Sequence, residues 1–197
     1  MTPAPPSTAA KCASGWLLAV DPGLLHPAAA AFRNGELVAA SRVKVPGRLA
    51  SLDRGERVRQ IVDLIAAWYA ALAPCAPVAV VGEFPKAYTR DKSKNSADQL
   101  FPLAAMSTGV AIRFGVESIT PLPSEWIGQI SKDDRAPADQ AWLSPRGKLI
   151  KACLREHEIP RVVLSHDAVD AVGLGLWGLG RLNGHGGAGP RRYPGAV

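Results

Sequence analysis

The sequence predicts a mixed α/β fold in which three antiparallel strands come first. Two apolar runs, 16–20 and 77–82, are typical of buried strands. Asn34-Gly35 between two apolar stretches predicts a tight hairpin, because both residues of such a turn need positive φ. Apolar residues recur at helical spacing between Val58 and Leu72 and predict an amphipathic helix. Helices and strands that alternate from there on favour a layered α/β sheet.

The remaining elements follow from periodicity and from residues that begin or end helices. Pro74 and Pro77 close the first helix, Pro102 falls early in the second, and Ser165 is the expected N-cap of the last. We expect further helices over 95–114, 123–130, 146–158 and 166–182, and a weaker strand over 116–123. The chain then holds five strands.

The composition is that of one globular domain, either with an anionic partner or as a basic protein without one. A chain of 197 residues with 47% hydrophobic and 20% charged residues has room for one core. Its 23 Lys and Arg against 17 Asp and Glu give a net charge of +6, which favours nucleic acid among anionic partners. Cys12, Cys75 and Cys153 fit no zinc spacing and cannot all pair, so we expect a reducing cytoplasm.

Two terminal stretches differ from this domain in composition. Residues 1–14 contain three prolines and no basic segment, so we expect a disordered lead rather than a signal peptide. Residues 183–197 are rich in Gly, Pro and Arg and predict a disordered basic tail. The folded domain is expected over 15–182. No apolar run is long enough to span a bilayer, so no membrane partner is expected.

Two acids stand where predicted strands end. Asp21 closes the first strand and Glu83 closes the strand at 77–82. Ligands and catalytic groups of α/β sheets collect at the carboxyl ends of strands. Asp-Pro-Gly is also ordinary turn chemistry, and an acid after a strand also suits a side chain that faces water. Both interpretations stay open for each acid taken alone.

The last predicted helix carries two more acids, Asp167 and Asp170. Three residues apart, they lie about 60° apart around the helix axis and one turn from each other. In the first turn, Asp167 also suits the helix dipole. Asp170 lacks this explanation, because the residues after it leave almost no polar face and predict a buried helix. A carboxylate there is costly unless its charge is compensated.

Four carboxylates that met would need such compensation. Two unit charges about 4 Å apart repel by about 4 kcal/mol at an effective dielectric of about 20. Protonation, basic partners or divalent cations relieve this, and oxygen-only ligands suit Mg²⁺ or Mn²⁺. Two such ions roughly 3.5–4 Å apart are a standard device of phosphodiester hydrolysis. Asp21, Glu83, Asp167 and Asp170 are therefore the candidate catalytic and metal-binding residues.

Four segments of the chain resemble RuvC-type Holliday junction resolvases of the RNase H-like superfamily. They are LLAVDPG, VVGEFPKAYTRDKSKNSADQL, RGKLIKACLRE and HDAVDAVGLGL, in the family's order, and the resemblance covers about residues 15–182. EFPKAY and PSEWIGQ make it closest to divergent phage-encoded members. The resemblance implies an RNase H-like fold, with a mixed five-stranded sheet whose first three strands are antiparallel and which is flanked by helices.

The resemblance also implies a homodimer that cuts two strands of a four-way DNA junction. It implies two Mg²⁺ ions in each active site, with Mn²⁺ as a substitute, and no nucleotide cofactor. Asp21 matches the family's first-strand aspartate, Glu83 its central-strand glutamate, and Asp167 and Asp170 its acidic pair on the last helix. Some members have histidine at the first position of that pair, which makes His166 a second candidate there.

Basic residues after Glu83 and on the helix at 146–158 are expected to bind the DNA backbone near such a site. The candidate DNA-binding residues are Lys86, Tyr88, Arg90, Lys92, Lys94, Lys148 and Lys151. Taken alone, the first group also fits a solvated loop, and the second fits any amphipathic helix. The family has a wedging aromatic shortly after the glutamate. Phe84 and Tyr88 flank that place here, and Lys86 occupies it.

The helix at 95–114 is the candidate dimer contact. Resolving a junction takes two symmetric nicks, and a two-fold dimer supplies two sites. This helix has more apolar surface than one sheet face needs, in Leu100, Leu103, Ala104, Met106, Val110 and Ile112. The alternative is that all of this surface packs on its own sheet.

The sequence thus predicts a metal-dependent, structure-selective DNA endonuclease of the crossover junction type. One alternative is another RNase H-like nuclease that acts on flaps, duplexes or RNA–DNA hybrids. The other is a non-catalytic DNA-binding protein of the same fold. The tryptophans do not decide between these, because Trp126, Trp142 and Trp177 are expected to pack in the core rather than under bases.

Overall fold

The computed structural model describes residues 15–85, 97–126, 150, 152–154 and 165–181. The predicted N-terminal lead and basic tail lie outside these ranges, and so do all seven candidate DNA-binding residues. The domain boundaries drawn from composition therefore stay predictions.

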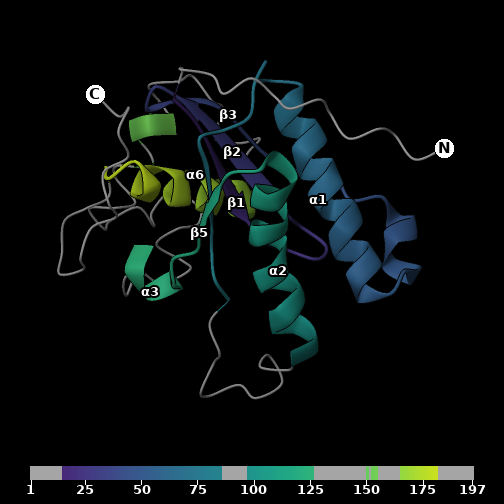
Figure 1. Cartoon of the computed structure of the whole chain (residues 1–197). Coiled ribbons are helices and arrows are strands. Elements are labelled where there is room, and N and C mark those ends of the chain that lie inside the picture. The colour runs from purple at the N-terminus through teal and green to yellow at the C-terminus, as the bar shows by residue number, and fades with distance from the viewer. Residues whose placement is uncertain (1–14, 86–96, 127–149, 151, 155–164, 182–197) are drawn as a thin grey trace.

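A five-stranded mixed sheet forms the centre of the molecule, with its strands in the order β3-β2-β1-β4-β5 (Figure 1). β1 (Trp16–Asp21), β2 (Ala28–Arg33) and β3 (Glu36–Arg42) form an antiparallel meander. β4 (Ala79–Gly82) pairs parallel with β1, and β5 (Glu117–Ile119) pairs parallel with β4. The predicted mixed sheet with three antiparallel strands first is confirmed.

The hairpin between β2 and β3 turns at the Asn-Gly pair. Asn34 has a φ of 51° and Gly35 a φ of 83°, the positive values that this turn requires. The Asn34 N–H donates to the Gly15 carbonyl at 3.0 Å, so the turn lies beside the start of β1. The predicted two-residue hairpin is confirmed.

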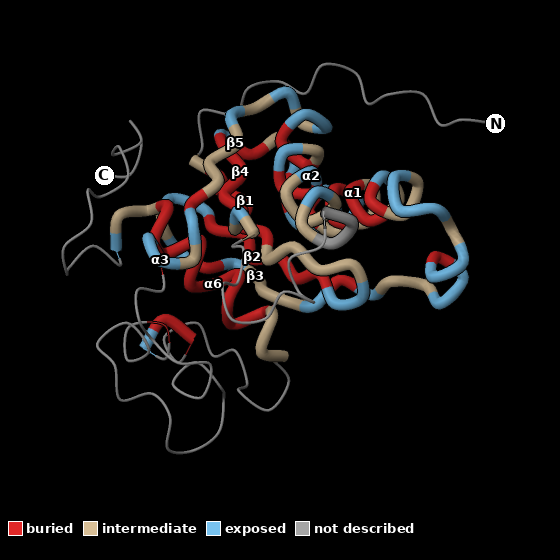
Figure 2. Tube along the Cα trace, turned by 90° about the horizontal axis from the view of Figure 1, so that it is seen from below, coloured by how far each residue is buried: buried red, intermediate tan, exposed pale blue. Residues whose placement is uncertain are grey.

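Two long helices cover one face of the sheet (Figures 1 and 2). α1 (Arg54–Ala70) is capped by Asp53, whose side chain accepts a hydrogen bond from the Glu56 N–H at 3.0 Å. It follows a short 3-10 helix, η1 (Gly47–Ser51), and packs beside α2 (Ala97–Phe114). Against them the strands bury the even-numbered side chains Trp16, Leu18, Val20 and Val80.

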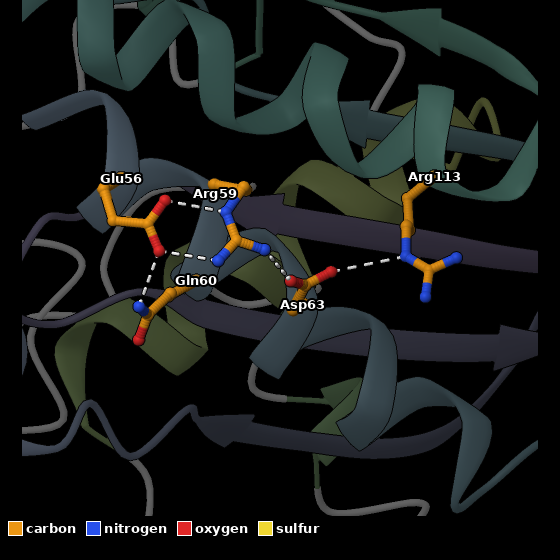
Figure 3. A network of polar contacts seen from close by, with 5 residues as sticks. All are labelled: Glu56, Arg59, Gln60, Asp63 and Arg113. Atoms are coloured by element: carbon orange, nitrogen blue, oxygen red, sulfur yellow. Dashed lines mark hydrogen bonds and ion pairs between the residues drawn. The ribbon is translucent and has the colours of Figure 1, made fainter. Parts of the chain in front are cut away.

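A chain of surface charges links α1 to α2 (Figure 3). Arg59 contacts Glu56 at 2.6 Å and Asp63 at 3.2 Å, and Asp63 in turn accepts from Arg113 of α2 at 3.3 Å. Hydrogen bonds from Arg59 and then from Gln60 lower the pKa of Glu56 to about 2. Such exposed pairs contribute little stability each, so the contact of α1 with α2 depends mainly on its apolar residues.

The opposite face of the sheet is covered by α6 (His166–Gly178). Strand alternation turns the other set of side chains to this side, namely Leu17, Ala19, Ala28, Ala30, Phe32, Ala79 and Val81. Trp126 of the short helix α3 (Pro123–Trp126) joins the same core, together with Ile150, Cys153 and Leu154. The two faces thus have separate cores, and the central strands β1, β2 and β4 are buried on both sides.

α6 lies unusually close to the sheet because glycines face it. A Cβ on Gly175 would lie 2.0 Å from Cε2 of Phe32, and a Cβ on Gly178 would lie 2.7 Å from Cγ2 of Val81. Real Cβ atoms essentially never come this close, so only glycine fits at these two positions without movement of the helix or of the facing side chain. Gly175 and Gly178 therefore set the distance between α6 and the strands.

We predict that Gly175→Ala destabilises the fold, because Phe32 is fully buried and has no free space to move into. Overpacking of this kind costs about 1–3 kcal/mol in the free energy of unfolding, measured by urea denaturation. Gly47→Ala is the control, since nothing lies within 4 Å of a Cβ at that position. A Gly175→Ala variant as stable as Gly47→Ala would contradict the close packing.

Candidate active site

Asp21 and Glu83 end adjacent parallel strands at the same level. In the β1–β4 pairing Val20 is opposite Gly82, so the next residues of the two strands, Asp21 and Glu83, are neighbours at the carboxyl edge. Neighbouring strands lie about 4.8 Å apart, so the backbones at Asp21 and Glu83 are as close as two strand ends of one sheet can be. The sequence predicted both acids to lie at strand ends, and the backbone register brings those two ends together.

Strand alternation also assigns both acids to one face. Leu17 and Ala19 of β1 belong to the core under α6, as do the corresponding β4 residues Ala79 and Val81. Side chains two residues apart on a strand point to the same side. Asp21 and Glu83 continue these rows, so they extend toward the side that α6 covers.

α6 begins near that same edge of the sheet. Its last residue, Gly178, lies over Leu17 at the start of β1, and Arg181 just beyond it donates to the Gly35 carbonyl in the hairpin turn at 3.0 Å. The helix therefore runs antiparallel to β1, with its N-terminus toward Asp21. Ser165 caps this end and accepts a hydrogen bond from the Ala168 N–H at 3.3 Å, as predicted.

A surface hollow of about 450 Å³ brings the first-strand acid and the helix acid together. Asp21 and Asp167 both line it, along with Arg57, Leu103 and residues 22–26. β1 and α6 thus contribute one carboxylate each to a single hollow, although the two residues are far apart in the chain.

Asp170 lies one turn further along α6 and is buried. It is 8% exposed, and every residue from Ala168 to Gly178 is buried with it. Its Oδ2 lies 3.4 Å from Nδ1 of His166, a contact that is an ion pair when the imidazole is protonated. The predicted buried carboxylate is confirmed. His166, the second candidate for the earlier acid of the pair, lies beside it.

Glu83 has a partner that the sequence did not indicate. Its Oε2 accepts a hydrogen bond from Nε1 of Trp126 at 2.8 Å. The prediction that Trp126 is buried is confirmed, since it is 2% exposed. A buried indole needs an acceptor, but the identity of that acceptor depends on how α3 packs and leaves no local signal in the sequence.

The four acids fit a divalent cation in their chemistry but do not form a preassembled cage. Carboxylate oxygens are the ligands that Mg²⁺ and Mn²⁺ prefer. Within the described ranges, no three His, Cys, Asp or Glu side chains are arranged so that they could hold a metal ion. Strand register and helix packing therefore gather the acids at one edge of the sheet, while the side chains do not converge on one point.

A second hollow of about 460 Å³ adjoins the first, and four basic side chains line it together with apolar ones. His26, Arg42, Lys44 and Arg57 contribute to it, and it shares His26 and Arg57 with the hollow that contains Asp21. Arg57 also donates from Nε to the Leu49 carbonyl at 2.8 Å, which holds η1 against α1. Arg42 and Lys44 lie at and just after the end of β3, whereas His26 and Arg57 come from other parts of the chain, so no single charged run in the sequence indicated the set.

Comparison with known proteins gives a structural match but no sequence match. No protein-family model and no curated protein matches the chain. The structure of T. thermophilus RuvC in complex with a Holliday junction substrate is similar at a TM-score of 0.53, with 17% identity over 82% of this chain and 90% of that one. The chain has the RNase H-like fold. A Thermus thermophilus RuvC structure also matches, with a TM-score of 0.49, 18% identity, and coverage of 82% and 91%.

The likeness to RuvC shows a shared fold and nothing beyond it, since only 17% of the aligned residues are identical. The structure that matches at a TM-score of 0.53 comes from T. thermophilus, so it gives no support to a closer likeness to phage-encoded members. Among the helices in the described ranges, none combines the length and hydropathy needed to cross a bilayer.

Proposed function

We propose that the chain is a metal-dependent DNA endonuclease that resolves four-way junctions by paired, symmetric nicks. One observation carries this proposal: Asp21 and Glu83 end level on adjacent parallel strands, and α6 brings Asp167 and Asp170 to the same edge. The similar RuvC structure is bound to a Holliday junction, which supports this choice of substrate.

In this proposal Asp21, Glu83, Asp167 and Asp170 hold two Mg²⁺ ions, for which Mn²⁺ can substitute. Such ions supply an activated water and stabilisation of the leaving oxygen in phosphodiester hydrolysis. The chain's own part is to fix the ligands and to limit water. Because Asp170 is buried in an apolar helix, a charge interaction that it makes is stronger than the same interaction in water. The basic hollow beside Asp21 is suited to bind the phosphate backbone on either side of the cut.

We predict that Asp21→Asn, Glu83→Gln, Asp167→Asn and Asp170→Asn each abolish cleavage while the protein still folds and binds DNA. Each change removes charge but almost no volume. The measurement is cleavage of four-way junction, duplex, flap and RNA–DNA hybrid with Mg²⁺ and with Mn²⁺.

Asp63→Asn is the matched control for these variants, since Asp63 is an exposed acid on α1 that contacts Arg59 and Arg113 (Figure 3). It should cleave as the wild type does. If Asp170→Asn cuts at the normal rate in Mg²⁺, the metal site is assigned to the wrong residues. Preference for flap or hybrid over junction would instead favour the broader RNase H-like nuclease.

We predict that Lys44→Ala and Lys86→Ala weaken DNA binding and flatten its dependence on salt. Lys44 lines the basic hollow, and Lys86 follows the site glutamate in the chain. Each lost phosphate contact should lower the log–log salt slope by about 1. Arg33→Gln is the control, because Arg33 pairs with Trp16 at the opposite end of the sheet. Slopes equal to that of Arg33→Gln would move the DNA surface elsewhere.

The outer face of α2 is the surface on which we propose that a second copy docks. Phe101 and Ile112 are 73% and 74% exposed, and Ala105 and Thr108 between them are exposed as well. Their 4-3-4 spacing forms one stripe along the helix, as in paired helices. Of the residues expected from the sequence to make this contact, Met106 and Val110 are fully buried in the protein's own core.

We predict a dimer at micromolar concentration in sedimentation, and a monomer for the double variant Phe101→Glu with Ile112→Glu. Two charges in an apolar two-fold contact would face their copies across the interface. The monomer should nick one junction strand without the paired second nick. Val38→Glu is the control, since Val38 is 45% exposed on β3. A wild type that is monomeric even on a four-way junction would rule out resolution by this route.

A further inference from the structure

One oxygen of Glu83 is held by the indole of Trp126. Nε1 of Trp126 donates to Oε2 of Glu83 at 2.8 Å, an ordinary length for an N–H···O hydrogen bond. Trp126 is 2% exposed, so its N–H must find an acceptor inside the protein. The acceptor is the Glu83 carboxylate at the end of β4, although a backbone carbonyl would have satisfied the indole equally well.

The turn that carries Trp126 is itself fixed to the end of β4. The Phe84 N–H donates to the Pro121 carbonyl at 2.8 Å and so extends the contact between the chain after β4 and the chain after β5. The Leu122 N–H donates to Oε2 of Glu125 at 2.6 Å, which closes α3 directly after this point. The chain thus brings Trp126 back to Glu83, the residue that follows β4.

The ring of Trp126 also lies against α6. A Cβ on Gly173 would be 2.6 Å from Cζ3 of Trp126, so the ring occupies the space that a side chain would need there. Gly173 is three residues beyond Asp170, one turn along the same helix. One side chain therefore contacts both the strand-end glutamate and the helix that carries the two aspartates.

We infer that Trp126 is a positioning residue of the candidate metal site, which orients the Glu83 carboxylate through its N–H and holds it relative to α6 through its ring. The inference rests on the proposed function, since it takes Glu83 as a metal ligand. Removing such an outer partner of a ligand typically weakens metal binding or activity by roughly 10–100-fold. In the competing view Glu83 merely satisfies a buried indole, and the bond affects stability alone.

The test compares Trp126→Phe, which removes the N–H, with Trp177→Phe. Trp177 is buried in the same core layer, so its replacement loses the same ring volume. Mn²⁺ binding is measured by electron paramagnetic resonance without DNA, and the Mg²⁺ dependence of junction cleavage is measured separately. For Trp126→Phe both should shift to roughly 10–100-fold higher metal concentration, with DNA affinity in the absence of metal unchanged. Trp177→Phe should stay close to the wild type in both.

Trp126→3-benzothienylalanine is the second variant, since it keeps the shape of the indole and replaces the N–H with sulfur. It tests the same bond if Trp126→Phe does not fold. Metal affinities for both Trp126 variants equal to that of Trp177→Phe would overturn the inference while leaving the metal site in place. Failure of the proposed function looks different: Glu83→Gln would then bind Mn²⁺ as tightly as the wild type, or the wild type would bind none, and the inference would fall with it.

Discussion

The close contact between α6 and the sheet is the constraint on which the rest of the structure depends. Gly175 and Gly178 let the helix backbone approach Phe32 and Val81 at distances that no Cβ would permit. The alanines of β2 match this on the other side, because short side chains make a shallow surface on which a helix lies low. Such a contact has little freedom to slide or rotate, so it determines where the acids of α6 lie relative to the strand ends.

The same packing explains why Asp170 is in so apolar a place. A helix pressed this closely onto a sheet buries nearly its whole circumference, and α6 is buried from Ala168 to Gly178. A carboxylate inside it lowers stability unless its charge is compensated, and Nδ1 of His166 lies 3.4 Å from Oδ2 of Asp170. Buried charged groups are paired or bind metal ions. The burial of Asp170 is thus an argument about function as well as about the core.

The features that could be predicted from the sequence are those encoded locally. The Asn34-Gly35 turn, the Ser165 cap and the apolar circumference of α6 each depend on neighbours in the chain, and each is confirmed. The contact of Trp126 with Glu83 joins residues 43 positions apart and has no local pattern. The prediction for α2 was incomplete for another reason. This helix is apolar on most sides, so its periodicity did not distinguish Met106, which is buried, from Ile112, which is 74% exposed.

The candidate site is therefore organised by backbone first and by side chains second. Strand register sets Asp21 level with Glu83, and the α6 contact sets Asp167 beside Asp21, yet the described side chains form no ready cage for a cation. A ligand that binds only the assembled arrangement stabilises that arrangement by mass action. In the proposed site, metal binding would be coupled to the packing of α6, because three of the four acids depend on α6. Two of them lie on it, and Glu83 reaches it through Trp126. Loosening the glycine contacts would weaken the site even though no glycine touches a ligand.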